Sequence, residues 1–199
     1  MTTSKPKLRT GTRMSLDEFL ALGETDERLE LFDGVLYVMS TPTKDHQFLM
    51  RWIARYFDDH IDAFEIPPAE IHLDITTILS AELPRAVEPD IVVILAGRDN
   101  IGGTIHVEGV PDIVVEILSS DRNHDLVFKR RIYAEAGVRE YWIFDPVNDT
   151  VLPLELHDGE YVERPTLTAA DTLATPLLPG LSIPLVDIFH HRRRPPREE

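Results

Sequence analysis

The sequence predicts a mixed α/β fold in which a central mixed β-sheet is flanked by helices. Two near-continuous runs of β-branched residues, at 90–95 and 112–118, are typical of strands buried on both faces of a sheet. Helical periodicity follows at 125–136, and the apolar run at 140–144 indicates a third strand. The order strand, helix, strand indicates a crossover connection, which joins parallel strands.

Hairpins are predicted near both ends of the chain. Residues 28–39 form two alternating apolar runs around the Asp-Gly dipeptide at 33–34, which is a strong hairpin-turn signal. Residues 150–163 repeat this pattern around the Asp-Gly dipeptide at 158–159. We therefore expect an N-terminal and a C-terminal β-hairpin in the fold.

Two helices are predicted before the first buried strand. Ser15 and Glu18 have the spacing of a capping box for a short amphipathic helix over 14–21. Pro42 can open a longer helix over 43–62, where apolar residues recur at helical spacing. The other predicted segments are a strand at 70–78, loops at 82–88 and 97–109, and a Pro-punctuated loop after 163 that ends in an apolar segment at 185–189.

Length and charge predict how the chain is divided. The 199 residues fit one domain, and the formal net charge is −15. Residues 1–13 carry +4 and residues 190–199 carry +2, which leaves −21 on residues 14–189. We therefore expect a basic flexible N-terminal arm (1–13), a single folded domain (14–189) and a basic flexible tail (190–199).

Composition also excludes several classes of function. The chain has no cysteine, which rules out disulfides, thiolate catalysis and Cys-based metal sites. The acidic body argues against a broad DNA-coating surface but not against a local nucleic-acid site. The basic N-terminal residues lead into no long apolar run, and no window approaches the roughly 18 apolar residues of a membrane span. A cytoplasmic protein without membrane contact is the expectation.

Two carboxylates stand in or beside the predicted buried strands. Asp90 opens one strand directly after Pro89, and Glu116 lies inside the other with apolar neighbours on both sides. An ionised carboxylate in such a place is costly unless it is paired or bound to metal. If the two strands are neighbours, Asp90 and Glu116 converge at one end of the sheet, where hard oxygen ligands suit Mg²⁺ or Mn²⁺. Glu116 could instead be a buried acid paired with an arginine.

The next predicted helix adds a cation. Asp125, Lys129 and Tyr133 are spaced four residues apart and therefore share one helix face. Because this helix follows the strand of Glu116, Lys129 could stabilise a metal-bound hydroxide or the charge on a phosphoryl group. The alternative for Asp125 and Lys129 is an ordinary ion pair on the helix surface.

Two further candidates lie upstream. Glu30 stands in the first strand of the N-terminal hairpin, where it could equally be a solvent-facing residue of an alternating strand. His46 lies near the start of the long helix, where it could also be a capping or surface histidine.

Several segments in this order resemble the Uma-two family of restriction-endonuclease-like proteins, within the PD-(D/E)XK nuclease superfamily. The resemblance extends from about residue 14 to residue 189. The segments that carry it are LELFDGVLYVMS, the helix-opening His46, EPDIVVIL, PDIVVEILSS, DLVFKRRIYAEAGV and EYWIFDP.

The resemblance assigns roles to particular residues. The superfamily's signature Asp falls on Asp90 and its signature Glu on Glu116. The signature Lys normally stands two residues after that Glu, where this chain has Leu118; the family relocates it to the following helix, at Lys129. Glu30 matches an extra N-terminal acid of the metal site. The segment SSDRNHD departs locally from the family's Ser-Pro turn.

Together these features imply a restriction-endonuclease-like fold and metal-dependent hydrolysis of phosphodiester bonds in DNA. The expected catalytic residues are Asp90, Glu116 and Lys129. The expected cofactor is Mg²⁺, with Mn²⁺ as a substitute. The expected metal ligands are Glu30, Asp90, Glu116 and the carbonyl of Ile117, and the residues expected beside the ligands or the substrate are His46, Asp125 and Tyr133.

Other functions fit the same residues. A nuclease fold can lose its chemistry and act in binding or assembly. A metal-dependent hydrolase of a small phosphoester would suit the acidic body better than duplex DNA does. A homodimer is a further expectation, since the apolar, Pro-rich C-terminal segment could pack on a partner.

Overall fold

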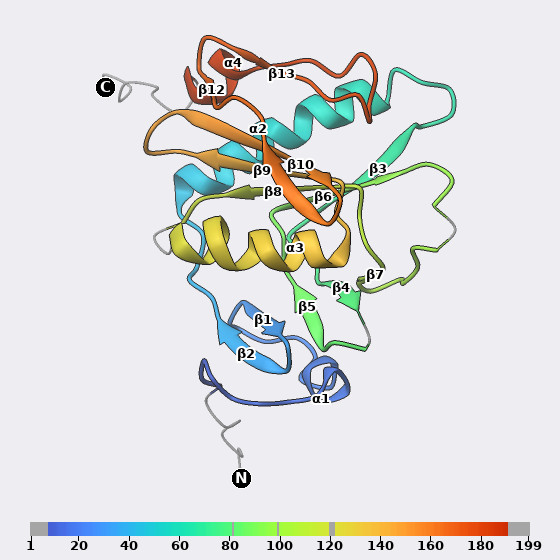
Figure 1. Cartoon of the computed structure of the whole chain (residues 1–199), viewed down its shortest axis with the longest axis vertical. Coiled ribbons are helices and arrows are strands. Elements are labelled where there is room, and N and C mark those ends of the chain that lie inside the picture. Colours follow the sequence, from blue (N-terminus) through green and yellow to red (C-terminus); the bar gives the residue numbers. More distant parts are fainter. Residues whose placement is uncertain (1–7, 81, 99, 120–121, 191–199) are drawn as a thin grey trace, which may run out of the picture.

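The structure is a computed structural model that describes residues 8–80, 82–98, 100–119 and 122–190. The first seven residues of the predicted N-terminal arm, and the predicted tail beyond residue 190, lie outside the described residues. Within the described ranges, helices cover a central β-sheet and a second sheet packs beneath it (Figure 1). In that part of the chain, none of the helices is both long and apolar enough to cross a membrane.

The central sheet is mixed, as the sequence predicts. Its strands lie in the order β11-β10-β9-β8-β6-β3, with β12 paired to β10. β8 and β9 run parallel, whereas β6 lies antiparallel to β8 and β10 antiparallel to β9, so the predicted crossover is confirmed. The strands are β3 (Ala69–Leu73), β6 (Ile91–Leu95), β8 (Ile113–Ile117), β9 (Glu140–Asp145), β10 (Thr150–His157), β11 (Glu160–Glu163) and β12 (Leu167–Thr168).

Both faces of this sheet are buried. α2 (Lys44–Ile61) and α4 (Leu185–His190) cover one face together with the short pair β13 (Thr172–Leu173) and β14 (Ile183–Pro184), and α3 (Arg130–Ala136) covers the other (Figure 1). Successive residues of β8 alternate between the two cores. Glu116 is in phase with Val114, which packs on the α3 side, so the strand directs this carboxylate toward α3.

The second sheet carries the N-terminal hairpin. Its strand order is β2-β1-β5-β4-β7. The hairpin is confirmed, with Leu29 opposite Val38 and a turn at Asp33 and Gly34, both of which have positive φ. The strands are β1 (Leu29–Phe32), β2 (Val35–Val38), β4 (Thr77–Ser80), β5 (Arg85–Val87) and β7 (Val107–Glu108).

Four segment predictions are wrong. One is the loop predicted after residue 163, which contains the short strands β12, β13 and β14. The predicted single strand at 70–78 is two strands, β3 and β4, in different sheets, because Asp74 adopts a left-handed φ of 46° and redirects the chain. The predicted loop at 82–88 contains β5, where the buried guanidinium of Arg85 is paired with Asp33 and Glu135. The predicted loop at 97–109 contains β7.

The N-terminal segment closes the second sheet. α1 (Leu16–Leu20) begins at Ser15 with the predicted capping box, in which Ser15 and Glu18 exchange hydrogen bonds. The part of the predicted arm from residue 8 onward lies along β2, where the N–H of Gly11 donates to the carbonyl of Leu36 over 2.8 Å. This part of the arm is therefore hydrogen-bonded to the fold.

The helix after β8 begins with an unexpected geometry. Its first part is a π-helix, η1 (His124–Lys129), which continues as α3 and ends at Gly137 with a left-handed φ of 95°. The predicted helix at 125–136 is therefore confirmed in place. The wider π turn is a common feature of functional sites, and here it carries Asp125 and Lys129 into the protein interior.

Asp112, at the opposite end of β8 from Glu116, is a structural anchor. Its side chain is fully buried, accepts the Leu95 N–H over 3.0 Å, and pairs with Arg98 and Arg139. These contacts tie the start of β8 to the end of β6.

We expect Asp112→Ala to lower the free energy of unfolding by about 2 kcal/mol, because it leaves the half-buried Leu95 N–H and two arginines without their buried acceptor. Urea unfolding followed by circular dichroism measures this loss. Asp59→Asn, which alters an exposed ion pair on α2, is the control and should change stability by less than about 0.5 kcal/mol. Equal stability of the two variants would contradict the anchoring role.

Candidate functional site

Adjacent strands bring Asp90 and Glu116 together. In the antiparallel pair of β6 and β8, Ile91 lies opposite Val115, so Asp90, one residue earlier, lies beside Glu116. Both side chains are buried, at 1% and 3% exposure. The convergence predicted for these acids at one end of the sheet is therefore present in the structure.

Asp90 is held by donors from three elements. Its Oδ2 accepts the Ile117 N–H over 2.7 Å and lies 3.0 Å from Nε2 of His46, at the start of α2. Its Oδ1 lies 3.3 Å from the guanidinium of Arg28. Burial alone would raise the pKa of Asp90, but His46 and Arg28 lower it below the usual value. Asp90 is therefore ionised at neutral pH.

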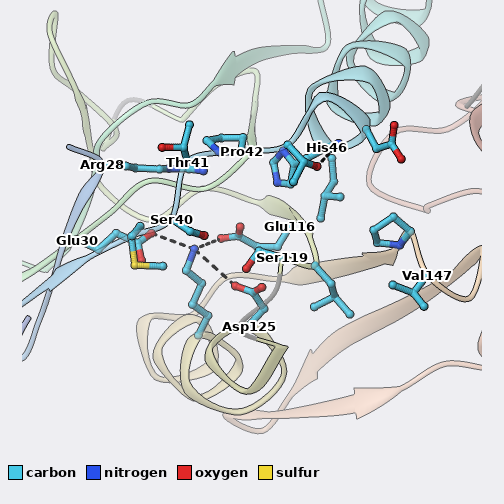
Figure 2. A pocket seen from close by; sticks show the side chains of 17 residues that line it. Arg28, Glu30, Ser40, Thr41, Pro42, His46, Glu116, Ser119, Asp125 and Val147 are labelled. Carbon is cyan, nitrogen blue, oxygen red and sulfur yellow. Dashed lines mark hydrogen bonds and ion pairs between the residues drawn. The ribbon is translucent and has the colours of Figure 1, made fainter. Parts of the chain in front are cut away.

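Lys129 lies at the centre of the acidic residues. Its Nζ is 2.8 Å from Glu116 Oε1, 2.9 Å from Glu30 Oε1 and 3.9 Å from Asp125 Oδ1. Figure 2 shows these three carboxylates pointing toward one ammonium group. Burial would lower the pKa of Lys129, but Glu116 and Glu30 outweigh it and raise the pKa above the ordinary value. The lysine is therefore a buried, permanent cation.

Glu116 carries the least stabilised negative charge of this group. Its Oε1 accepts hydrogen bonds from Lys129 and from the Tyr133 hydroxyl, the latter over 2.7 Å. Burial raises the pKa of Glu116 to about 8; Lys129 opposes the rise, but the charges of Asp90 and Asp125 add to it. At neutral pH this carboxyl holds a proton or needs a further cation.

Glu30 has the opposite electrostatic environment. Its Oε1 accepts the Glu88 N–H over 3.0 Å as well as the Lys129 ammonium, and its Oε2 lies 3.3 Å from Nε2 of His124. Burial would raise the pKa of Glu30, but Lys129, His124 and the Glu88 amide together lower it to about 2. Glu30 is thus a fully buried, well-stabilised carboxylate.

A pocket of about 520 Å³ gives access to the site (Figure 2). Its walls come from the end of β8, the start of α2, η1 and the turn after β9. Asp90 lies behind this wall. The charged and site-forming lining residues are Arg28, Glu30, His46, Glu116, Ile117, Asp125 and Lys129, and the apolar lining residues include Met39, Pro42, Pro146 and Val147.

Burial decides between the alternatives that the sequence leaves open. Asp125 and Lys129 are 5% and 3% exposed, so they are not a surface ion pair, and Glu30 does not face solvent. Among the described residues, the cation in direct contact with Glu116 is Lys129. His46 is buried beside Asp90, while the helix cap at its own N–H is the hydroxyl of Thr43.

The sequence reasoning missed Arg28 and His124. Arg28 stands two residues before Glu30, and a strand periodicity of two could have placed both on one side of β1. Arg28 also pairs with Asp74 and Glu88. His124 reaches Glu30 across 94 residues of sequence, and no local pattern reports such a contact.

The donor set fits a divalent cation in its chemistry. Asp90 and Glu116 offer hard carboxylate oxygens, and the excess negative charge at Glu116 is what such an ion would relieve. In the described ranges, no three histidine, aspartate or glutamate side chains already form a metal cage. The carboxylate of Glu116 is instead contacted by Lys129 and Tyr133. The carboxylate of Asp90 is contacted by Arg28 and His46.

Residues 16–186 match the Uma2 family, which is described as "Putative restriction endonuclease". The match covers most of the chain. The chain belongs to the Uma2 family. The resemblance inferred from the sequence is therefore confirmed, and the family description supports a nuclease.

A solved structure shares the fold of this Uma2 chain. A crystal structure from Anabaena variabilis, described as a "putative nuclease belonging to DUF820", superposes with a TM-score of 0.72 at 22% sequence identity. The superposition covers 90% of this chain and 99% of the other. It confirms the restriction-endonuclease-like fold class. A comparison with curated proteins found no match.

We expect Lys129→Met to lower the free energy of unfolding by about 3–5 kcal/mol, because it leaves Glu30 and Glu116 buried without their shared cation. Chemical unfolding in EDTA measures this loss. The double variant Lys129→Met/Glu116→Gln should recover part of the stability. Lys44→Met, at an exposed lysine at the start of α2, is the matched control, and a Lys129→Met protein as stable as this control would refute the pairing.

Proposed function

We propose that this chain is a metal-dependent endonuclease that hydrolyses phosphodiester bonds in DNA, with Mg²⁺ as its cofactor and Mn²⁺ as a substitute. One observation supports this proposal above the others. Asp90 and Glu116 lie side by side at the end of the sheet, with the Lys129 ammonium 2.8 Å from Glu116 and a pocket that both Glu116 and Lys129 line.

Asp90 and Glu116 would hold the ion. The ion would lower the pKa of a bound water molecule and neutralise charge on the scissile phosphate. The family resemblance adds Glu30 and the Ile117 carbonyl as ligands. The N–H of Ile117 already donates to Asp90, which orients that carboxylate. Arg28 and His46 restrain the same side chain from the other side.

Lys129 has the role of orienting the attacking water and stabilising negative charge on the phosphate. The ammonium is buried and remains charged at working pH, so its field acts in a low-dielectric environment. Tyr133 donates to the same Glu116 oxygen as Lys129 and fixes that carboxylate. Asp125, at 3.9 Å, adds a weaker restraint on the ammonium.

The acidic body limits affinity for DNA. Residues 14–189 carry a net charge of −21, which repels a polyanion over most of the surface. We therefore propose weak binding that depends on the divalent cation and weakens further with added salt.

Nicking of supercoiled plasmid tests the proposal. Wild type should nick in Mg²⁺ or Mn²⁺ and stop in EDTA, whereas Asp90→Asn, Glu116→Gln and Lys129→Ala should each be slower by at least about 100-fold. The first two lose a ligand of the ion, and the third loses the cation that stabilises charge on the phosphate. Asp59→Asn serves as the control and should retain the wild-type rate. Equal residual activity in wild type and all variants would indicate a contaminating nuclease and refute the proposal.

The charge and the small pocket favour one second candidate, a hydrolase of a small phosphoester. A pocket of about 520 Å³ can enclose a single nucleotide, and a small substrate avoids repulsion from the acidic surface. Competition by mononucleotides distinguishes the two candidates. Strong inhibition of plasmid nicking at micromolar mononucleotide would favour the small substrate, and no inhibition would favour DNA.

A further inference from the structure

Two carboxylates, those of Glu30 and Glu116, lie within 3 Å of the Lys129 ammonium, and their environments differ. Glu116 belongs to the pair proposed to hold the metal and has a destabilised charge. Glu30 comes from β1 in the other sheet, and its charge is well stabilised. The two distances, 2.8 and 2.9 Å, are almost equal. If Glu116 binds a divalent cation, Glu30 is the carboxylate that still contacts Lys129.

Protein donors already satisfy both oxygens of Glu30. Oε1 receives Lys129 and the Glu88 N–H, and Oε2 contacts His124 over 3.3 Å. A metal ligand at this position would have to break such contacts inside a fully buried environment. Because the Lys129 ammonium already lies 2.9 Å from one of its oxygens, Glu30 is suited to hold this lysine in place.

The packing around His124 fixes this arrangement. The rings of Phe32 and Tyr37 on the hairpin contact those of His124 and Phe128 on η1, with centroid distances of 5.0–5.6 Å. These four rings hold the hairpin against the π-helix. The helix that carries Lys129 and the strand that carries Glu30 are therefore joined twice, by the rings and by the charges.

We propose that Glu30 and His124 form a positioning pair that holds the Lys129 ammonium at the site, and that Glu30 is not a ligand of the metal. The proposal rests on the nuclease function proposed above, because that function gives the position of the ammonium its catalytic purpose. His124 fixes one oxygen of Glu30, which leaves the other aimed at Lys129. The ammonium then stays in place whichever group Glu116 contacts.

Three substitutions separate positioning from ligation. Glu30→Gln keeps the shape of the side chain but removes its charge. His124→Phe keeps a ring in the cluster but removes the nitrogen that contacts Glu30. Tyr37→Phe is the matched control, because it removes only a hydroxyl from the same ring cluster and leaves the Lys129, Glu88 and His124 contacts of Glu30 in place.

The first measurement needs neither metal nor substrate. The chain has four lysines, so the Lys129 ammonium can be assigned in a ¹⁵N–¹H NMR spectrum of lysine side chains. We expect its hydrogen exchange to speed up at least about tenfold in Glu30→Gln, because the carboxylate charge paired with the ammonium is lost. The increase should be smaller in His124→Phe, which loses only the nitrogen that contacts Glu30. Tyr37→Phe and Glu116→Gln should change it less than about threefold. Unchanged exchange in Glu30→Gln, or a larger change in Glu116→Gln, would overturn the proposal.

The second measurement is Mn²⁺ calorimetry. The dissociation constant should stay within about threefold of wild type in Glu30→Gln and rise at least about tenfold in Glu116→Gln, because only the latter loses a ligand. Equal weakening in both would make Glu30 a ligand and overturn the proposal. At saturating Mn²⁺, Glu30→Gln should still nick plasmid more slowly, through kcat and not KM. If wild type neither binds Mn²⁺ nor nicks DNA, the proposed function fails, and the NMR comparison alone decides the positioning pair.

Discussion

The ion pairs of the buried Lys129 ammonium join the parts of this protein that form the site. Glu30 reaches the ammonium from the second sheet and Glu116 from the central sheet, and the lysine itself comes from the π-helix between β8 and β9. An unpaired buried charge would be strongly destabilising. The hairpin, the central sheet and the helix must therefore all be packed together before these charges are paired. The ion pairs add to an apolar cluster that already joins the two sheets, in which Phe32 and Val87 of the second sheet pack with Val114 of the central sheet.

The carboxylates around this ammonium differ in a way that suits chemistry. Glu30 and Asp90 are stabilised as anions by several donors each, whereas Glu116 has a raised pKa because it is buried beside other acids. Such a spread of environments among neighbouring acids is a mark of functional sites. Asp112 offers the contrast within the same strand, since it is equally buried but its partners are two arginines and a backbone amide, far from the pocket. One strand therefore carries a structural acid at its start and a candidate functional acid near its end.

The sequence predicts the parts of the fold that depend on local patterns. Asp-Gly dipeptides mark both hairpins, β-branched runs mark β6 and β8, and an acid inside such a run identifies Glu116 as unusual. Parts that depend on distant partners escape prediction. β5 is three residues long and contains Arg85, whose burial makes sense only with Asp33 and Glu135, which are 52 and 50 residues away. The reversal at Asp74 and the π geometry of η1 have no periodic signal, and His124 therefore could not be connected with Glu30.

Diffraction from crystals soaked in Mn²⁺, recorded where manganese scatters anomalously, tests the central claim most directly. The account predicts one anomalous peak in contact with the carboxylates of both Asp90 and Glu116, with Lys129 still paired to Glu30. A saturating soak that gives no peak there, or a peak bound elsewhere in the molecule, would contradict the assignment of these two acids as the metal-binding pair.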